Sequence, residues 1–310
     1  MNKTPLLLLL AFLITLAAFG QAPQSRQSKP TTPKVTIEVK GNYRYITSNG
    51  LPDHATGRFP TRGNPNAISP QSYQYRVPVS PEVNEEFRLL GRMPFGVAIN
   101  GVNIDPSTAE WWKDDRSTGW HIEGISGGVG HLGMDSSNAH VQPTGAYHYH
   151  GIPNALHDRL AKNATKPVLV GWAADGFPIY GPVGYSDAMD ASSEVKELQS
   201  SWQLRSGDRP SEPQGPGGKY DGTYEQDFEF VEGSGDLDQA NGRFGVTAEY
   251  PKGTYYYVMT ETFPFIPRFL RGTPDESFER RQHGQRGGGH REGRPRGRGS
   301  APGNGRRPPR

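Results

Sequence analysis

The chain contains no cysteine among its 310 residues. This absence excludes disulfides, iron–sulfur clusters, thiol catalysis and cysteine-ligated zinc, so a metal site would have to use His, Asp, Glu or Tyr. Hydrophobic residues are also scarce, at 33%, and the mean hydropathy is −0.72. Together with 40 glycines and 28 prolines, this composition excludes a membrane-embedded protein and a coiled coil.

The sequence has one long apolar run, at residues 6–19, and it closely follows a positively charged N-terminal segment. The run is too short to span a bilayer and ends in small residues, which is typical of a secretory signal peptide over residues 1–20, cleaved between Gly20 and Ala22. Residues 21–33 are polar and proline-rich and are predicted to form a flexible lead-in. We therefore expect a secreted or periplasmic protein with no stable membrane span.

The charge is distributed unevenly along the chain. Residues 281–310 hold nine arginines and one glutamate, a net charge of +8; Lys3 adds +1, so residues 21–280 carry −7 of the total of +2. The Arg/Gly-rich tail, residues 279–310, lacks apolar anchors and is predicted to be disordered. Its charge predicts weak adhesion to an anionic polysaccharide or another polyanion, and no protein partner is inferred.

Between residues 34 and 278, short β-branched or aromatic runs alternate with Gly, Pro, Asn and Asp. The clearest runs are residues 35–39, 73–77, 97–99, 168–170 and 254–259. This pattern predicts one all-β domain, an antiparallel sandwich or a barrel-like architecture, with α+β as the alternative. Helical signals occur at 106–112 and 192–200, which predicts one or two short helices.

An internal repeat stands out in this domain. Two segments, residues 135–150 and 238–258, share the pattern D-x-x-N-small-basic, then a loop, then G-small-Y-x-Y. Asp, Asn and Gly favour turns, and alternating aromatics favour a strand, so the repeat is interpreted as architectural. The three histidines of the first copy are replaced in the second: His140 by Arg243, His148 by Tyr256 and His150 by Val258. The scaffold therefore does not require imidazole at these positions.

His148 and His150 are two residues apart in a predicted strand, so their side chains project to the same face, about 7 Å apart at the backbone. This spacing allows both to bind one ion. The nearest third ligand is His140, and His131 and Asp135 are also close in sequence. Three protein ligands and an open position describe a catalytic zinc site, and imidazole-rich sites also suit copper. The alternative is that the histidines are structural and bond to carbonyls or solvent.

Asp175 is a further candidate. It follows the apolar run at 168–172 and enters a tight turn, where an Asp either stabilises the turn, ligates a metal or accepts a bond from a ligating imidazole. No glutamate lies between Glu123 and Glu194. A carboxylate ligand would therefore have to be an aspartate or a residue distant in sequence.

At these residues the chain resembles a known family. The motifs that carry the resemblance are NAH at 138–140, PTGAYHYHGIP at 143–153, ADGFPIYGP at 174–182, YDGT at 220–223 and GDLD…NGRFG at 235–245. They resemble the YHYH-domain family of secreted or extracytoplasmic proteins over most of residues 90–275. The resemblance implies the domain and not a particular activity. It also implies cysteines in relatives near the positions of Ser137, Ala155, Ala240 and Phe269, so this chain would hold the same loops by packing or by metal alone.

The sequence thus predicts a secreted protein that binds a divalent transition metal, copper or zinc, through a histidine cluster, with metal-dependent hydrolysis as the chemistry that an open coordination position supports. The alternative is a non-catalytic extracytoplasmic binding module with structural histidines and a polyanion-adhesive tail. An open position in a cleft would favour the first hypothesis, and a closed ligand shell the second.

Overall fold

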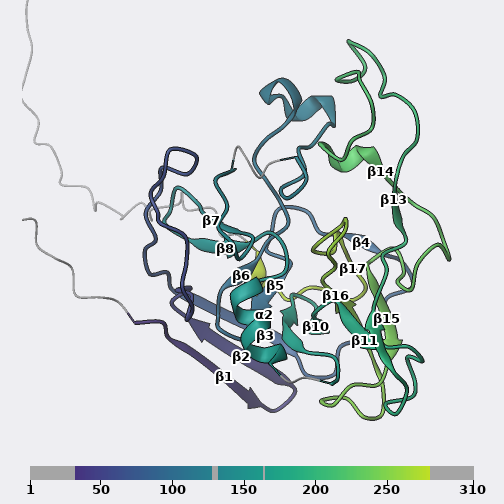
Figure 1. Ribbon diagram of the computed structural model, residues 1–310. Coiled ribbons are helices and arrows are strands. Elements are labelled where there is room, and N and C mark those ends of the chain that lie inside the picture. Colours follow the sequence, from purple (N-terminus) through teal and green to yellow (C-terminus); the bar gives the residue numbers. More distant parts are fainter. Residues whose placement is uncertain (1–31, 128–131, 163–164, 280–310) are drawn as a thin grey trace, which may run out of the picture.

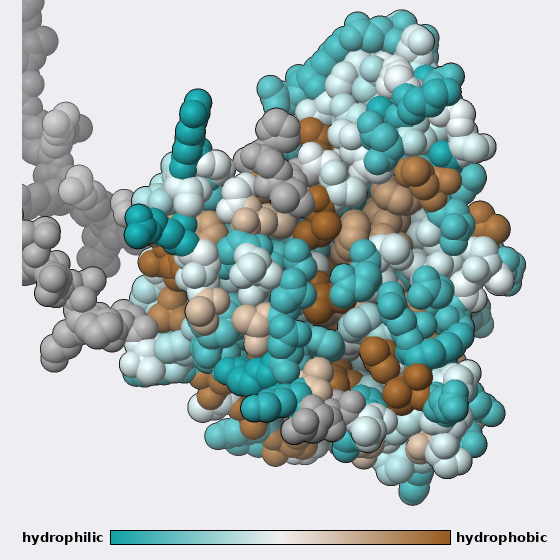
Figure 2. All heavy atoms as spheres, viewed as in Figure 1, coloured by the Kyte–Doolittle hydropathy of each residue, from teal (hydrophilic) through white to brown (hydrophobic). Residues whose placement is uncertain are grey.

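The computed structural model describes residues 32–127, 132–162 and 165–279 (Figure 1). The following predicted features lie outside these ranges: the signal peptide (1–20), nearly all of the lead-in (21–33), His131 and nearly all of the tail (279–310). In the described ranges, no helix has the length and apolar character needed to cross a membrane. The visible face is largely hydrophilic, with apolar side chains near its middle (Figure 2).

The centre of the fold is an eight-stranded sheet with the order β15-β16-β10-β9-β5-β6-β8-β7. Its strands, in chain order, are β5 (Gly96–Ala98), β6 (Asn103–Ile104), β7 (Ala139–Val141), β8 (Tyr147–Tyr149), β9 (Leu169–Ala173), β10 (Pro178–Tyr180), β15 (Gly242–Gly245) and β16 (Thr254–Val258). The three-stranded antiparallel sheet consists of β1 (Val35–Lys40), β2 (Tyr43–Ser48) and β3 (Tyr73–Pro78). Three two-stranded sheets pair β4 (Arg88–Leu89) with β17 (Phe269–Leu270), β11 (Val183–Tyr185) with β12 (Val195–Glu197), and β13 (Trp202–Leu204) with β14 (Phe228–Phe230).

The order of the eight strands is symmetric about the central antiparallel pair, β5 and β9. On one side, β6 pairs with β5 in antiparallel fashion and β8 pairs with β6 in parallel. On the other side, β10 pairs with β9 in antiparallel fashion and β16 pairs with β10 in parallel. Both β8 and β16 are the second strand of a hairpin. The first strand of that hairpin, β7 or β15, ends the sheet. The two hairpins therefore lie at opposite ends of the sheet (Figure 1), and they are the two copies of the repeat found in the sequence.

A second internal repeat underlies the symmetry. Residues 96–105 (GVAINGVNID) and 171–180 (GWAADGFPIY) match at four of ten positions. Each copy folds into β5–β6 or β9–β10 around a glycine whose φ is positive, +82° at Gly101 and +95° at Gly176. Glycine adopts this conformation without steric cost, which explains its presence in both turns. At the centre, Val97 pairs with its own counterpart Trp172, so the sheet consists of two related four-strand units.

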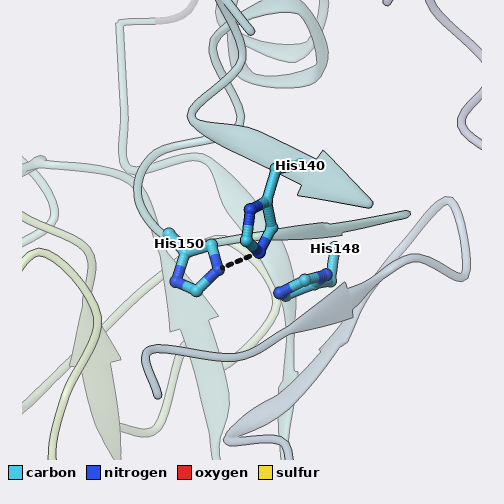
Figure 3. Close-up of side chains that lie close together, drawn as sticks. All are labelled: His140, His148 and His150. Carbon is cyan, nitrogen blue, oxygen red and sulfur yellow. Dashed lines mark hydrogen bonds between the residues drawn. The ribbon is translucent and has the colours of Figure 1, made fainter. Parts of the chain in front are cut away.

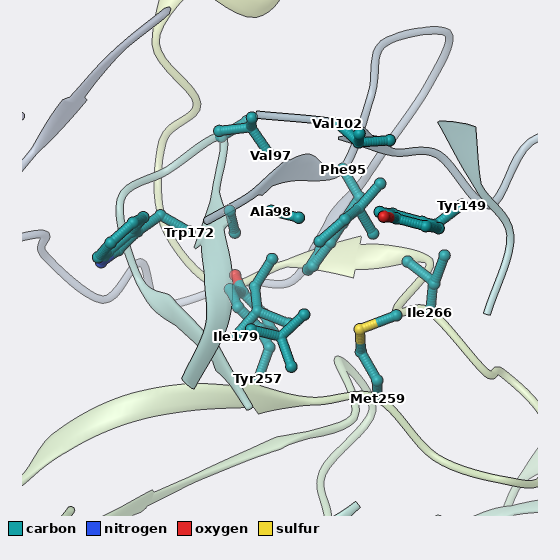
Figure 4. Close-up of a cluster of buried hydrophobic side chains, with 14 of the residues drawn as sticks. Phe95, Val97, Ala98, Val102, Tyr149, Trp172, Ile179, Tyr257, Met259 and Ile266 are labelled. Carbon is teal, nitrogen blue, oxygen red and sulfur yellow. The ribbon is translucent and has the colours of Figure 1, made fainter. Parts of the chain in front are cut away.

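The main core lies against this central sheet (Figure 4). Buried side chains from both units meet there, including Phe95, Val97, Val102, Tyr149, Ile179, Tyr257, Met259 and Ile266. The three-stranded sheet adds Ile46, Tyr75 and Val77 to the same cluster. Burying such side chains contributes about 1.5–3 kcal/mol each. This shared core fixes the position of the end hairpins, one of which carries the histidines.

The helix α2 (Asn154–Ala161) was not predicted from the sequence pattern, and it buries Leu156. Short 3-10 turns occur at η1 (Trp112–Asp114), η2 (Arg116–Thr118), η3 (Glu225–Asp227) and η4 (Glu276–Phe278). The expected helix at 192–200 is wrong, because Val195–Glu197 is β12 and pairs with β11. Tertiary pairing overrides the weak helical propensity of this segment. Of the expected helix at 106–112, only the last residue enters η1.

The predicted all-β class with short helices is confirmed. Within the described residues, β7 and β15 end the central sheet, so the sheet is open and does not close into the barrel that was one of the two predicted architectures.

Candidate metal centre

The three predicted histidine ligands come together on the β7–β8 hairpin (Figure 3). His140, the central residue of β7, pairs directly with His148 of β8. His150 follows β8 and lies two residues from His148. The backbone N–H of His150 donates to the Asn138 carbonyl at 2.7 Å. The three ring centroids are 4.6–4.7 Å apart. The expectation that His148 and His150 project to the same face of the strand is thus confirmed.

One nitrogen of each of these rings lies within 4.8 Å of the others, an arrangement that could hold a metal ion. The Nε2 atoms of His140 and His150 are 3.1 Å apart. Nδ1 of His140 faces the Leu132 carbonyl at 2.9 Å and Nδ1 of His148 faces the Ala146 carbonyl at 3.3 Å. Carbonyls accept hydrogen bonds, so these contacts place protons on Nδ1 and orient the rings for ligation through Nε2, as is usual for metal-bound histidine.

His150 contains an orphaned atom. Its Nδ1 is buried without a hydrogen bond of regular geometry, and the backbone of Pro106 is the group positioned to accept one. If Nε2–H of His150 donates to Nε2 of His140, Nδ1 of His150 carries no proton and has no donor. With an ion between the Nε2 atoms, the proton resides on Nδ1 and points to Pro106. Metal binding therefore satisfies the orphaned atom.

The surroundings favour the neutral form of His140 and His150. His148 and His150 are only 2% and 1% exposed. Burial holds the pKa of His150 well below its ordinary value, and the neighbouring histidines and Arg268 act in the same direction. Burial also lowers the pKa of His140, partly offset by the Leu132 carbonyl and by the negative charge of Glu110. Neutral imidazole is the ligating form, so the environment prepares these side chains for a cation.

A glycine makes room for the deepest ring. A Cβ atom placed on Gly124 would lie 3.1 Å from Nδ1 of His150 and 3.3 Å from the Thr108 methyl group. Both distances are tighter than ordinary van der Waals contact. The loop that follows Glu123 thus approaches the cluster closely because residue 124 lacks a side chain.

Two predicted ligands are placed elsewhere. Asp135 accepts hydrogen bonds from the backbone of Gly57 and Ser137 and, at 2.7 Å, from Tyr147, whose side chain projects from the opposite face of β8 to the histidines. Asp175 stabilises the β9–β10 turn instead, as described next. His131 lies outside the described residues. In the described part of the chain, the cluster is the one group of three or more potential metal-ligating His, Asp or Glu side chains.

Asp175 belongs to the architecture of the second unit. Its carboxylate accepts bonds from the Tyr257 hydroxyl and the backbone N–H groups of Phe177 and Gly272. Burial nevertheless raises its pKa to about 6. Its counterpart in the first unit, Asn100, likewise bonds to the tyrosine equivalent to Tyr257, and the turn-stabilising alternative considered for Asp175 describes its contacts.

The second hairpin serves as an internal comparison. Asn138 and Asn241 occupy the same turn position, with φ of +53° and +52°. In place of the three imidazoles, the second copy holds Arg243, whose Nε donates to the Tyr256 hydroxyl at 2.6 Å, and the buried Val258. Tyr256 and Val258 pack in a small apolar cluster with Tyr180, Leu198 and Leu237. In the second copy, this face of the hairpin is thus filled by ordinary side-chain packing.

The histidines border a cleft of about 1120 Å³. His140 and His148 line it, whereas the more deeply buried His150 does not. The cleft is also lined by Glu110, Trp111, His121, Glu225 and Arg268. An ion held by the three Nε2 atoms would therefore lie at the wall of an open cleft, which leaves a coordination position accessible from one side.

A buried chain of charged groups supports the cleft. Arg268 donates to Glu123 at 2.8 Å and its Nε lies 3.1 Å from Glu225. Glu225 lies 3.1 Å from Nδ1 of His121, which stacks on Trp111 with the ring centroids 4.2 Å apart. Arg268 lowers the pKa of Glu225 below its ordinary value despite burial. Sequence reasoning missed these residues, because they come from separate segments and form no local motif.

Comparison with models of protein families shows to which family the chain belongs. The model of the family described as YHYH protein matches residues 74–272. The chain belongs to this family. The YHYH segment that names the family is residues 147–150 here, and it supplies two histidines of the cluster and the two tyrosines that pack on the other face. Comparisons with curated proteins and with solved structures found no match.

Proposed function

We propose that this YHYH protein binds one divalent transition metal ion, copper or zinc, through Nε2 of His140, His148 and His150. The observation that carries the proposal is the convergence of three imidazoles, two of them buried and one half-buried, with two Nε2 atoms 3.1 Å apart. The hairpin at the other end of the sheet supports it, because the same scaffold there is filled by Arg243 and Tyr256.

The chemistry that best suits the site is metal-dependent hydrolysis. A divalent ion lowers the pKa of a bound water to about 7 and polarises a carbonyl or phosphoryl oxygen. The cleft bordered by His140 and His148 gives a substrate access to the fourth position. A closed shell would have favoured the alternative hypothesis of a non-catalytic module with structural histidines, and the open cleft favours a reactive centre.

We further propose an extracytoplasmic location and a polyanion-adhesive tail. The support is the signal-like pattern of residues 1–20 and the charge of +8 on residues 281–310. The absence of cysteine is compatible with export, since the scaffold described above requires no disulfide. The metal centre does not depend on either proposal.

The deciding experiment is elemental analysis of the protein purified without a histidine tag from its native compartment. We expect about one equivalent of copper or zinc in the wild type and a large loss in His148→Ala. His157→Gln is the matched control, because His157 lies outside the cluster, on α2. Metal-poor wild-type protein that also shows no thermal shift with added zinc or copper would reject the proposal in favour of structural histidines.

A further inference from the structure

The metal-facing cleft contains a carboxylate that the sequence did not single out, Glu110. It lines the cleft together with His140 and His148. Its Oε2 accepts a bond from the Ala109 N–H at 2.7 Å, and its backbone carbonyl accepts one from Ile122 at 3.1 Å. The first bond restrains the side chain, and the second ties its segment to the strand-like stretch that follows His121.

The charge of Glu110 reaches the histidine cluster. Glu110 and His140 line the same cleft, and the negative charge of the carboxylate acts to raise the pKa of His140, against the lowering by burial. No hydrogen bond joins the two side chains among the described contacts, and Glu110 is not one of the three clustered ligands. Glu110 therefore shares the cleft with His140 and His148 without belonging to the ligand set.

The other carboxylates of the cleft are in different situations. Glu225 is held between Arg268 and His121, so its charge is already compensated. Asp114 lies on the exposed turn η1. Glu110 is partly buried, makes a single side-chain bond to its neighbour's backbone and makes no ion pair among the described residues. It is therefore the cleft carboxylate best placed to exchange a proton with a molecule bound beside the cluster.

We propose that Glu110 is the general base of the site, acting on a water at the open coordination position, and that the substrate is an ester or amide that enters the cleft. This inference rests on the proposed function. The water gives one proton to the Glu110 carboxylate while its oxygen forms a bond to the substrate carbonyl carbon. The bond from that carbon to the leaving oxygen or nitrogen then breaks, and Glu110 returns the proton to the leaving atom. Such transfers contribute typically 10²–10⁴-fold in rate.

The test compares Glu110→Gln with Asp114→Asn, which removes the same charge from the same cleft. Full-length protein is loaded with cobalt(II), and azide is titrated while the visible spectrum is recorded. Azide is an anion that occupies open coordination positions, and a nearby carboxylate repels it. We expect Glu110→Gln to strengthen azide binding roughly fivefold and Asp114→Asn to change it less than about twofold. Zinc-loaded Glu110→Gln should hydrolyse 4-nitrophenyl acetate on the order of a hundredfold more slowly at unchanged metal content.

The outcomes separate the two proposals. A wild-type protein that takes up no cobalt, or whose cobalt spectrum does not respond to azide, rejects the proposed function itself. Normal azide binding with no difference between the two variants shows that Glu110 does not face the open position. Loss of metal in Glu110→Gln would make Glu110 a ligand, and full hydrolysis in that variant would exclude it as the base. Each of these last three results overturns the inference while leaving the histidine site intact.

Discussion

His140 and His150 face each other with their Nε2 atoms 3.1 Å apart, beside a cleft that His140 lines and at one end of a nearly symmetric sheet. The Leu132 carbonyl fixes the proton of His140 on Nδ1, so its Nε2 only accepts. Either His150 donates to it, which leaves Nδ1 of His150 unsatisfied in the interior, or a cation lies between the two rings. The predictions below follow from this geometry.

Removing a ligand should abolish tight metal binding without unfolding the protein. We expect His148→Ala and His150→Ala to weaken zinc or copper binding by at least about a hundredfold, since even the outer partners of metal ligands are worth about 10–100-fold. Tyr256→Ala, at the position equivalent to His148, should instead lower the free energy of unfolding by about 3–5 kcal/mol, because it empties an apolar cluster. Calorimetric titration and thermal unfolding check both effects. Equal metal affinity in the three variants would contradict the ligand assignment.

Metal binding should depend on pH through the imidazoles. Protons compete with the ion, and burial lowers the pKa of His140 and His150 from the unperturbed imidazole value of about 6.5, so binding should fail at a pH below that value. Folding lowers the pKa of His140 and His150, so the unfolded chain binds more protons below about pH 6.5. The metal-free protein should therefore lose stability as the pH falls from that value. A titration that stays flat from pH 7 to about 4.5 would indicate carboxylate ligands.

The buried charge chain gives a stability prediction. Arg268→Met leaves Glu123 and Glu225 without their cation, and breaking a buried pair in this way costs about 3–5 kcal/mol. Arg205→Met provides the comparison, because its pair with Glu229 is exposed and is worth about 0–1 kcal/mol. Denaturant unfolding of both variants measures the difference. Similar midpoints for the two variants would mean that the buried network does not stabilise the cleft wall.

Deleting residues 281–310 should leave the fold and the metal site intact and abolish retention on polyanions. The segment carries +8 while residues 21–280 carry −7, so the truncated protein is acidic. Retention of the full chain should weaken steeply with salt, because release of counterions drives such contacts. Heparin chromatography and a thermal melt of both forms test this. Unchanged elution, or a lower melting temperature after truncation, would place the adhesive surface elsewhere or show that the tail contacts the domain.

The histidine cluster could be predicted from the sequence because its members obey a local rule. His148 and His150 share a strand face, and His140 lies on the partner strand of the same hairpin, so all three histidines fall within eleven residues. Asp135 is also close in sequence but does not join the cluster, because its carboxylate accepts a hydrogen bond from Tyr147 on the opposite face of β8.

The cleft could not be predicted in this way. Glu110, His121 and Arg268 meet only through tertiary packing, and no spacing in the sequence relates them. The symmetry of the sheet did leave a signal, the match between residues 96–105 and 171–180, which lay outside the repeat that we recognised. That match also predicts the role of Asp175, because its counterpart Asn100 lies in the equivalent turn and bonds to the equivalent tyrosine.

The central claim is that three imidazoles bind one ion, and X-ray absorption spectroscopy of the zinc-loaded full-length protein tests it most directly. We predict a first shell at about 2.0–2.1 Å with the outer scattering of three imidazoles and one further light ligand. His148→Ala should reduce the imidazole contribution. A first shell made of oxygen alone, or one identical in the wild type and His148→Ala, would contradict the assignment of His140, His148 and His150 as the metal centre.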